Sequence, residues 1–172
     1  MKSKINHISH FLAFLFMIAA VASFFMKYLV YPYHTNGFNL AGEIFGALNV
    51  RLGGIFVGAA LTALGFVFAW VSLILHHWLG LRFSGVGVGI CSAGSAVAMI
   101  IFAVRLAARK TPSWFPNAGE PFVLGYGIYV CIAALICAFI CAVIGLVTYR
   151  PKDIDEVSGK KTNPQSVNVL NV

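Results

Sequence analysis

Four long stretches of the 172-residue chain contain no Asp, Glu, Lys or Arg, and they limit the possible folds more than any other feature. They comprise residues 10–26, 52–75, 83–104 and 122–149. A helix that crosses a bilayer needs about 20 apolar residues. Every backbone polar group in hydrocarbon must be paired inside the protein, which excludes open sheets as spanning elements. The stretches therefore predict an all-α membrane protein.

The order of these stretches predicts a bundle of four transmembrane helices that run alternately up and down. We expect the spans at residues 7–26, 52–75, 84–106 and 122–149. Only a short segment, 76–83, separates the second and third stretches, so these two helices are expected to be antiparallel neighbours. Residues 27–51 and 105–121 then form two outer loops. The polar segment 150–172 has no apolar period and is predicted to be a disordered tail.

The start of the chain allows a second interpretation. Lys2, Lys4 and the small residues 20–22 fit a cleavable signal peptide. The apolar stretch nevertheless continues beyond these small residues to Met26. We therefore predict that the first stretch is a retained span.

The charge of the chain fits a membrane protein. Charged residues make up only 10% of it, and a soluble domain has about 25%. Seven Lys and Arg residues lie on the side of the two termini and five on the other side, which predicts cytosolic termini. We expect a multi-pass protein of the plasma membrane, with an organelle membrane as the alternative. The net charge of +7 is interpreted as headgroup contact and topology, and not as nucleic-acid binding.

Small side chains recur at four-residue steps within the stretches. Helices in lipid associate by close backbone approach, which small residues permit. In the fourth stretch the series forms one narrow helix face, in which cysteine acts as a small hydrophobe. The residues that we predict to pack helix against helix are Gly54, Gly58, Gly85, Gly89, Gly94, Ala133, Cys137, Cys141 and Gly145.

Two groups of Cys and His residues offer an alternative to packing. Cys137 and Cys141 stand one helical turn apart, but a structural zinc site needs four ligands and the fourth stretch contains no His. We therefore predict no metal site. Four histidines fall at one predicted membrane face, where a bis-histidine haem is a candidate: His7, His10, His76 and His77. Histidines at the interface are more often anchors, so we predict no cofactor.

No pattern of a catalytic site accompanies these stretches. They contain no carboxylate or amine for a proton or ion path. Glu43 and Glu120 are the only carboxylates before the tail, and pairing with an arginine is a simpler role for them than a catalytic dyad. We therefore predict that the chain is not an enzyme. A channel is a further alternative, with pore-lining hydroxyl groups at Thr62, Ser72, Ser92 and Ser95.

Two segments resemble a known membrane family. The segment GYGIYVCIAA, residues 125–134, is similar to the start of the last span in the amastin-like surface proteins. The segment VRLGGIFVGAALTALGF, residues 50–66, is similar to their second span. With its layout of helices and loops, the chain also resembles the wider claudin-like tetraspan superfamily. Residues 27–51 lack the Trp and the Cys pair that mark the first outer loop in both groups, so no family site residue is carried over to them.

These observations lead to one expected function and one alternative. We expect a non-catalytic tetraspan with a structural, adhesive or assembly role, which acts through helix–helix and outer-loop contacts. Its expected partners are the lipid bilayer and, by self-association or otherwise, membrane proteins. The alternative is an accessory membrane subunit of a larger complex, for example a respiratory assembly, near a haem.

Overall fold

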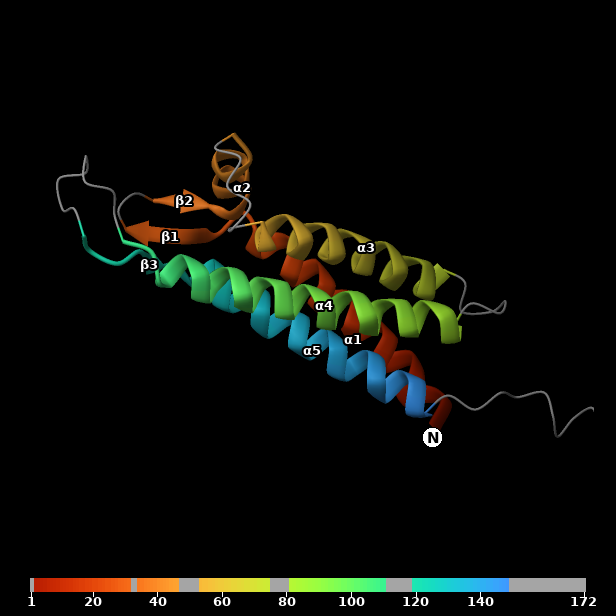
Figure 1. Ribbon diagram of the computed structural model, residues 1–172. Helices are drawn as coiled ribbons and strands as arrows, with labels where there is room; N and C mark the ends of the chain where they lie inside the picture. Colours follow the sequence, from red (N-terminus) through yellow and green to blue (C-terminus); the bar gives the residue numbers. More distant parts are fainter. Residues whose placement is uncertain (1, 32–33, 47–52, 75–80, 111–118, 149–172) are drawn as a thin grey trace, which may run out of the picture.

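The computed structural model describes residues 2–31, 34–46, 53–74, 81–110 and 119–148, and these are mostly helical (Figure 1). The predicted tail at 150–172 and most of the predicted turn at 76–83 lie outside the described residues.

Four long helices pack side by side and form what we call the helical body (Figure 1). They are α1 (Lys2–Ser23), α3 (Gly54–Ile74), α4 (Leu81–Ala107) and α5 (Tyr126–Thr148). Each helix packs against two neighbours, so the order around the body is α1, α5, α4, α3. Successive long helices run in opposite directions (Figure 1). The end of α1, the start of α3, the end of α4 and the start of α5 therefore meet at one end of the body.

Three of these helices are long and apolar enough to cross a membrane: α3, the part of α4 from Gly85 to Ala107, and α5. They contain 21, 23 and 23 residues. At 1.5 Å per residue each is roughly 30 to 35 Å long, which matches the hydrocarbon core of a bilayer. The described apolar part of α1, Ile8–Ser23, is shorter. The chain is thus a mostly helical protein with three membrane-length helices in its described part.

The helical body has small side chains inside and large apolar side chains outside. The interior residues are mostly Gly, Ala and Ser, and the large side chains buried among them include Met17, Met99, Phe102 and Leu135. The outward residues include side chains that are 52% to 79% exposed, namely Val57, Trp70, Ile90, Val104 and Val147. An apolar surface of this extent is prone to aggregation in water, whereas lipid solvates it. The distribution of side chains therefore fits lipid as the solvent.

A small sheet and a short helix cover one end of the helical body, and together we call them the cap (Figure 1). Strand β1 (Lys27–Tyr31) pairs antiparallel with both β2 (Thr35–Asn36) and β3 (Val123–Leu124). Helix α2 (Gly37–Gly46) follows β2 directly. Asn36 Oδ1 accepts a hydrogen bond from the Asn39 N–H at 2.8 Å and so caps the start of α2. The sequence predicted an outer loop over residues 27–51, and the structure adds the strands β1 and β2 and the helix α2 within it.

The cap also sets the ends of the long helices. α5 begins at Tyr126, and not at residue 122, because the segment before it pairs with β1 as β3. α1 ends at Ser23, and not at residue 26, because a turn after Ser23 leads into β1. α4 ends at Ala107, close to the predicted position 106. Beyond it the chain turns, and the Arg109 carbonyl oxygen accepts a hydrogen bond from the Phe122 N–H at 3.2 Å.

Candidate functional site

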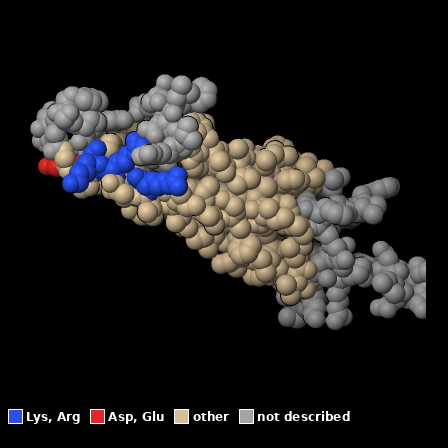
Figure 2. Space-filling view, viewed as in Figure 1, with Lys and Arg blue, Asp and Glu red and all other residues tan. Residues whose placement is uncertain are grey.

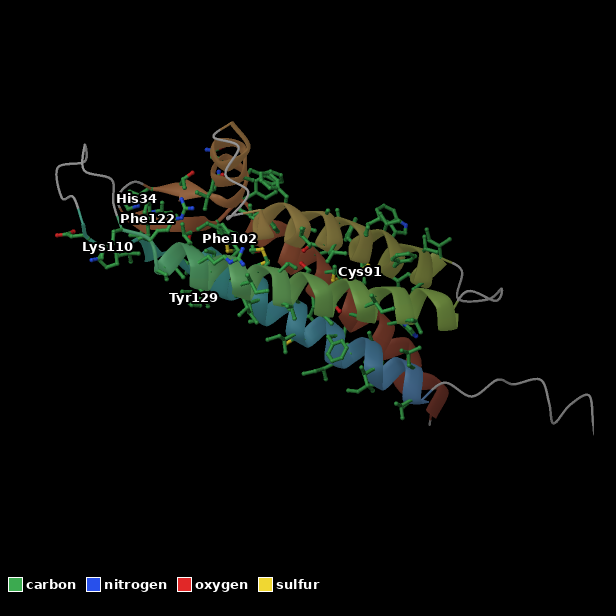
Figure 3. The ribbon with its side chains drawn as sticks, viewed as in Figure 1. His34, Cys91, Phe102, Lys110, Phe122 and Tyr129 are labelled. Carbon is green, nitrogen blue, oxygen red and sulfur yellow. The ribbon has the colours of Figure 1, made fainter. Side chains whose placement is uncertain are left out.

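Helices α3 and α4 are in close contact at two glycines of α3. A Cβ atom at Gly54 would lie 3.0 Å from the Ala98 carbonyl oxygen and 3.3 Å from Phe102 Cβ. At Gly58 a Cβ atom would lie 2.6 Å from Met99 Sδ. Phe102 and Met99 are fully buried, and Phe102 lies in the interior of the body (Figure 3). The two glycines therefore let the backbones of α3 and α4 approach each other.

A cluster of hydroxyl groups adds hydrogen bonds to this contact. Thr62 Oγ1 and Ser95 Oγ each lie 2.7 Å from the Gly58 carbonyl oxygen and 2.7 Å from each other. Each hydroxyl has one proton, so two protons serve three contacts. One hydroxyl donates to the carbonyl oxygen, and the other donates either to the same oxygen or to its neighbouring hydroxyl. The Ser95 bond to Gly58 links α4 directly to the backbone of α3.

The four hydroxyl groups that the channel alternative would place along a pore all make hydrogen bonds inside the protein. All four residues are at most 3% exposed. Ser92 Oγ donates to the Val88 carbonyl oxygen of its own helix at 2.6 Å. Ser72 Oγ lies 3.2 Å from His10 Nδ1. These groups therefore serve contacts within and between helices in the described part of the chain.

The end of the helical body that is remote from the cap holds a buried histidine. His10 of α1 is only 4% exposed, and Ser72, its partner, belongs to α3. A Cβ atom at Gly145 of α5 would lie 3.2 Å from His10 Nε2, and one at Gly85 of α4 would lie 3.3 Å from Cε1. One imidazole ring thus links α1 to the three other long helices. The expectation of an interfacial anchor is wrong for His10, because the two glycines leave room for its ring inside the body.

This geometry bears on the haem alternative. A haem ligand needs one ring nitrogen directed into a space that admits the iron and the porphyrin. His10 Nδ1 faces Ser72 and Nε2 faces Gly145, so the described surroundings of the ring do not fit a haem. The side chains of the other three candidates, His7, His76 and His77, lie outside the description.

The buried face of α5 lies beside the face that the sequence predicted. Its buried residues are Gly127, Ile128, Cys131, Ala134, Leu135, Ala138, Ala142 and Gly145. Ala133 is exposed and does not pack inside the helical body, and Cys137 and Cys141 are half-buried at the edge of the face. The sequence contains two adjacent series of small residues at four-residue steps. The buried series is the one that shares its face with the large side chains of Ile128 and Leu135.

The other predicted packing residues differ in how closely they meet a neighbour. Gly89 is buried, and a Cβ atom there would lie 3.9 Å from Ala142 Cβ, an ordinary contact distance. Gly94 is half-buried, and a Cβ atom there would lie 3.0 Å from the end of the Leu61 side chain. Gly89 therefore leaves room for a methyl group between α4 and α5.

The cysteines of the described residues are free thiols, and no group of three His, Cys, Asp or Glu side chains among these residues could hold a metal ion. Cys91 lies on the α3 side of α4, with its Cβ 3.1 Å from where a Cβ atom at Gly65 would be (Figure 3).

The cap is fixed to α5 through two glycines. The Gly125 N–H donates a hydrogen bond to the Tyr28 carbonyl oxygen at 2.8 Å. A Cβ atom at Gly125 would collide with the Lys27 carbonyl oxygen, and one at Gly127 would lie 2.7 Å from the Tyr28 ring. Glycine at both positions lets β1 lie against the start of α5. In the sequence these glycines stood out only within the GYG segment of a family resemblance.

Three buried polar side chains complete this attachment, and the sequence did not indicate them. Ser23, Tyr28 and Cys131 come from α1, β1 and α5, and all three are fully buried. Ser23 Oγ donates to the Ala20 carbonyl oxygen at 2.6 Å and lies 3.3 Å from the Tyr28 hydroxyl. Because the serine proton is directed to Ala20, Ser23 Oγ can accept a hydrogen bond from the Tyr28 hydroxyl, which also has the Cys131 thiol as a hydrogen-bonding neighbour. The one signal in the sequence was that Ser23 is the only hydroxyl residue of the apolar stretch 10–26.

We expect the stability of the protein to fall at alkaline pH because of Tyr28. Burial, with a smaller effect of the Cys131 thiol, raises the pKa of Tyr28 well above its usual value. The folded state therefore keeps a proton that the unfolded state loses above a pH of about 10. Stability from this group is full below that pH and declines as pH rises above it, by up to about 1.4 kcal/mol per pH unit.

Detergent-induced unfolding between pH 8 and pH 11 measures this decline. Tyr28→Phe should remove this part of the slope, whereas Tyr126→Phe, at an exposed position, should keep it. Equal slopes in the two variants would show that Tyr28 does not contribute.

Comparison with known proteins matches the chain to no protein-family model and to no curated protein.

Proposed function

We propose that the chain is a non-catalytic tetraspan of the membrane, which acts as a structural, adhesive or assembly protein. The observation that carries this proposal is the arrangement of side chains in the helical body. Its polar groups are buried and bonded among themselves at Gly58, Thr62 and Ser95, while large apolar side chains face outward. Such a body offers its outer surface to lipid and to other membrane helices.

A fourth span at α1 belongs to the same proposal. α1 packs lengthwise against α5 and α3 and so lies in the same layer as two membrane-length helices. Its outward side chains are also apolar, with Ile8 58% and Phe11 52% exposed. These features support a four-helix, claudin-like up-and-down bundle. We further propose the plasma membrane as its location, with cytosolic termini, the latter from the distribution of Lys and Arg residues along the sequence. The amastin-like resemblance is part of this proposal.

The cap supports an adhesive or assembly role because it presents apolar side chains outside the helical body. Phe25 and Phe38 are 69% and 53% exposed, and their ring centroids lie 4.8 Å apart. Val123 of β3 is 48% exposed. Exposed aromatic pairs of this kind are common where proteins meet partners or a membrane interface.

A substitution at Ala133, a small residue on the outer face of α5, is the best test of self-association. Ala133 is exposed and lies on the same helix face as the half-buried Cys137 and Cys141, so a second helix can approach there. Ala133→Leu should therefore lower the yield of cross-linked dimers in native membranes several-fold and leave the unfolding of the single chain unchanged. Ala134→Leu is the matched control, because Ala134 is buried and the larger side chain should disturb the fold.

Purification in mild detergent separates the proposal from its alternative. Assemblies of this chain alone, weakened by Ala133→Leu, support self-association. A stable complex with other membrane proteins, together with cross-linking that Ala133→Leu does not change, would favour the accessory-subunit alternative. A haem version of that alternative requires a Soret band in the visible spectrum of the purified complex.

A further inference from the structure

Four cationic side chains gather at the cap end of the helical body. Figure 2 shows Lys and Arg side chains close together on one face at this end. Among the side chains that the structure describes, the cationic Lys and Arg are Lys27, Arg105, Arg109 and Lys110, which we call the basic band. Glu120 is exposed at the same end and is the described carboxylate nearest to them in sequence. The band therefore carries an excess of positive charge.

The backbone under the basic band is fixed by the cap. Arg105 lies in the last turn of α4. The Arg109 carbonyl oxygen accepts the hydrogen bond from the Phe122 N–H, and the backbone of Lys110 forms an antiparallel β-bridge with Pro121. Lys27 begins β1, and its carbonyl oxygen contacts Gly125. The four charges are thus attached to elements that hold one another, and not to a free tail.

The basic band lies where the apolar surface of the helices ends. Val104 directly precedes Arg105 and is 64% exposed. On the neighbouring helix α5, Tyr126 and Tyr129 are 56% and 59% exposed, and Tyr129 points away from the body (Figure 3). Tyrosines at this position are typical of the level at which lipid headgroups lie. The cations follow immediately beyond the hydrocarbon level, within reach of lipid phosphates.

We propose that the basic band binds the headgroup phosphates of anionic phospholipids in the leaflet at the cap end, which is the extracytosolic leaflet in the orientation proposed above. This inference rests on the proposed function, since it requires insertion in a bilayer. Arginine presents a fork of N–H donors that matches phosphate oxygens, and lysine adds a point charge. An anionic lipid such as phosphatidylglycerol carries net negative charge, whereas the choline group of phosphatidylcholine neutralises its own phosphate. The band therefore discriminates between the two lipids by charge.

The position of the basic band, at the edge of the apolar surface, favours a lipid as its ligand. A soluble acidic ligand or a nucleic acid would contact the charges alone and would leave the neighbouring apolar surface without a partner. Here an exposed apolar surface begins one residue away, at Val104. A phospholipid is the ligand that offers a phosphate beside a hydrocarbon chain, and it matches both surfaces at once.

The test compares lipid retention by the full chain in mild detergent. The protein is mixed with equal amounts of phosphatidylglycerol and phosphatidylcholine, and retained lipid is counted by native mass spectrometry. We expect preferential retention of phosphatidylglycerol, reduced ~10-fold in the variant Arg105→Gln/Arg109→Gln/Lys110→Gln. The control Lys152→Gln/Lys160→Gln/Lys161→Gln removes the same charge from the tail segment and should retain the lipid as the wild type does.

A second measurement keeps the proposal testable if the triple variant does not fold. Retention of phosphatidylglycerol by the wild type should fall as salt is raised from roughly 50 mM to roughly 500 mM, because salt in this range screens exposed charges. Equal retention of the two lipids, or an equal loss in both triple variants, would overturn the proposal. So would equal thermal stabilisation by inorganic phosphate and by phosphatidylglycerol.

Failure of this inference can be told apart from failure of the proposed function. If the wild-type chain leaves the membrane fraction during an alkaline carbonate wash, the membrane proposal itself is wrong. If it stays in that fraction and shows no preference for phosphatidylglycerol, only the lipid-binding inference is wrong.

Discussion

Gly125→Ala is expected to release the cap from the helical body and to lower the free energy of unfolding by about 3 kcal/mol. The added methyl group would collide with the Lys27 carbonyl oxygen. A backbone oxygen in a paired strand cannot rotate away as the end of a side chain can. The strand would have to move, and the hydrogen bond from the Gly125 N–H to the Tyr28 carbonyl oxygen would be lost. Unfolding in mixed detergent micelles measures the change.

The control for this prediction is Gly89→Ala. There the new methyl group meets only Ala142 Cβ at 3.9 Å, an ordinary contact. Alanine is also the better helix former, by up to ~1 kcal/mol. The control variant should therefore be as stable as the wild type or more so. Equal losses in Gly125→Ala and Gly89→Ala would contradict the role that we give to Gly125.

Gly58→Leu should separate α3 from α4 and lower the free energy of unfolding by about 3 kcal/mol or more. The first carbon of the new side chain would already lie 2.6 Å from Met99 Sδ. Met99 is fully buried, so its side chain has no open space to enter. The remaining carbons would force the helices apart and remove the bond from Ser95 Oγ to the Gly58 carbonyl oxygen.

Ala60→Leu is the matched control on the same helix. Ala60 is exposed, and an additional apolar side chain there meets lipid or detergent. Its unfolding should stay within about 0.5 kcal/mol of the wild type. The Gly58 contact lies within one chain, so the primary effect of Gly58→Leu is on the fold and not on assembly. If both variants unfold like the wild type, the close contact between α3 and α4 is not a source of stability.

The long helices could be predicted because an uncharged apolar stretch of about 20 residues or more is typical of a membrane-spanning helix, in which every backbone polar group is paired. The predicted span 52–75 contains all of α3, and the predicted span 84–106 lies within α4. The sheet could not be predicted in this way. β2 and β3 have two residues each, too few for an alternating pattern, and β1 pairs with β3 across a large sequence separation, for example Leu29 with Leu124.

Packing residues could be predicted where sequence spacing left one choice. Gly54 and Gly58 follow from their spacing alone, and they lie at the α3–α4 contact. On α5 two series of small residues compete, and the buried one is the series that shares its face with Leu135. His10 shows a different limit. Its burial depends on space provided by Gly85 and Gly145, which belong to two other helices far along the chain.

The small residues inside and the large ones outside have a consequence for how such a chain changes over time. A lipid tail accepts valine, isoleucine, leucine or phenylalanine equally well, so positions such as Val57, Ile90 and Val147 are under little constraint beyond being oily. Gly58 and Gly125 do not tolerate even one more carbon without moving a neighbour. Related proteins should therefore differ most at the positions that face lipid, and should keep the glycines at the close contacts.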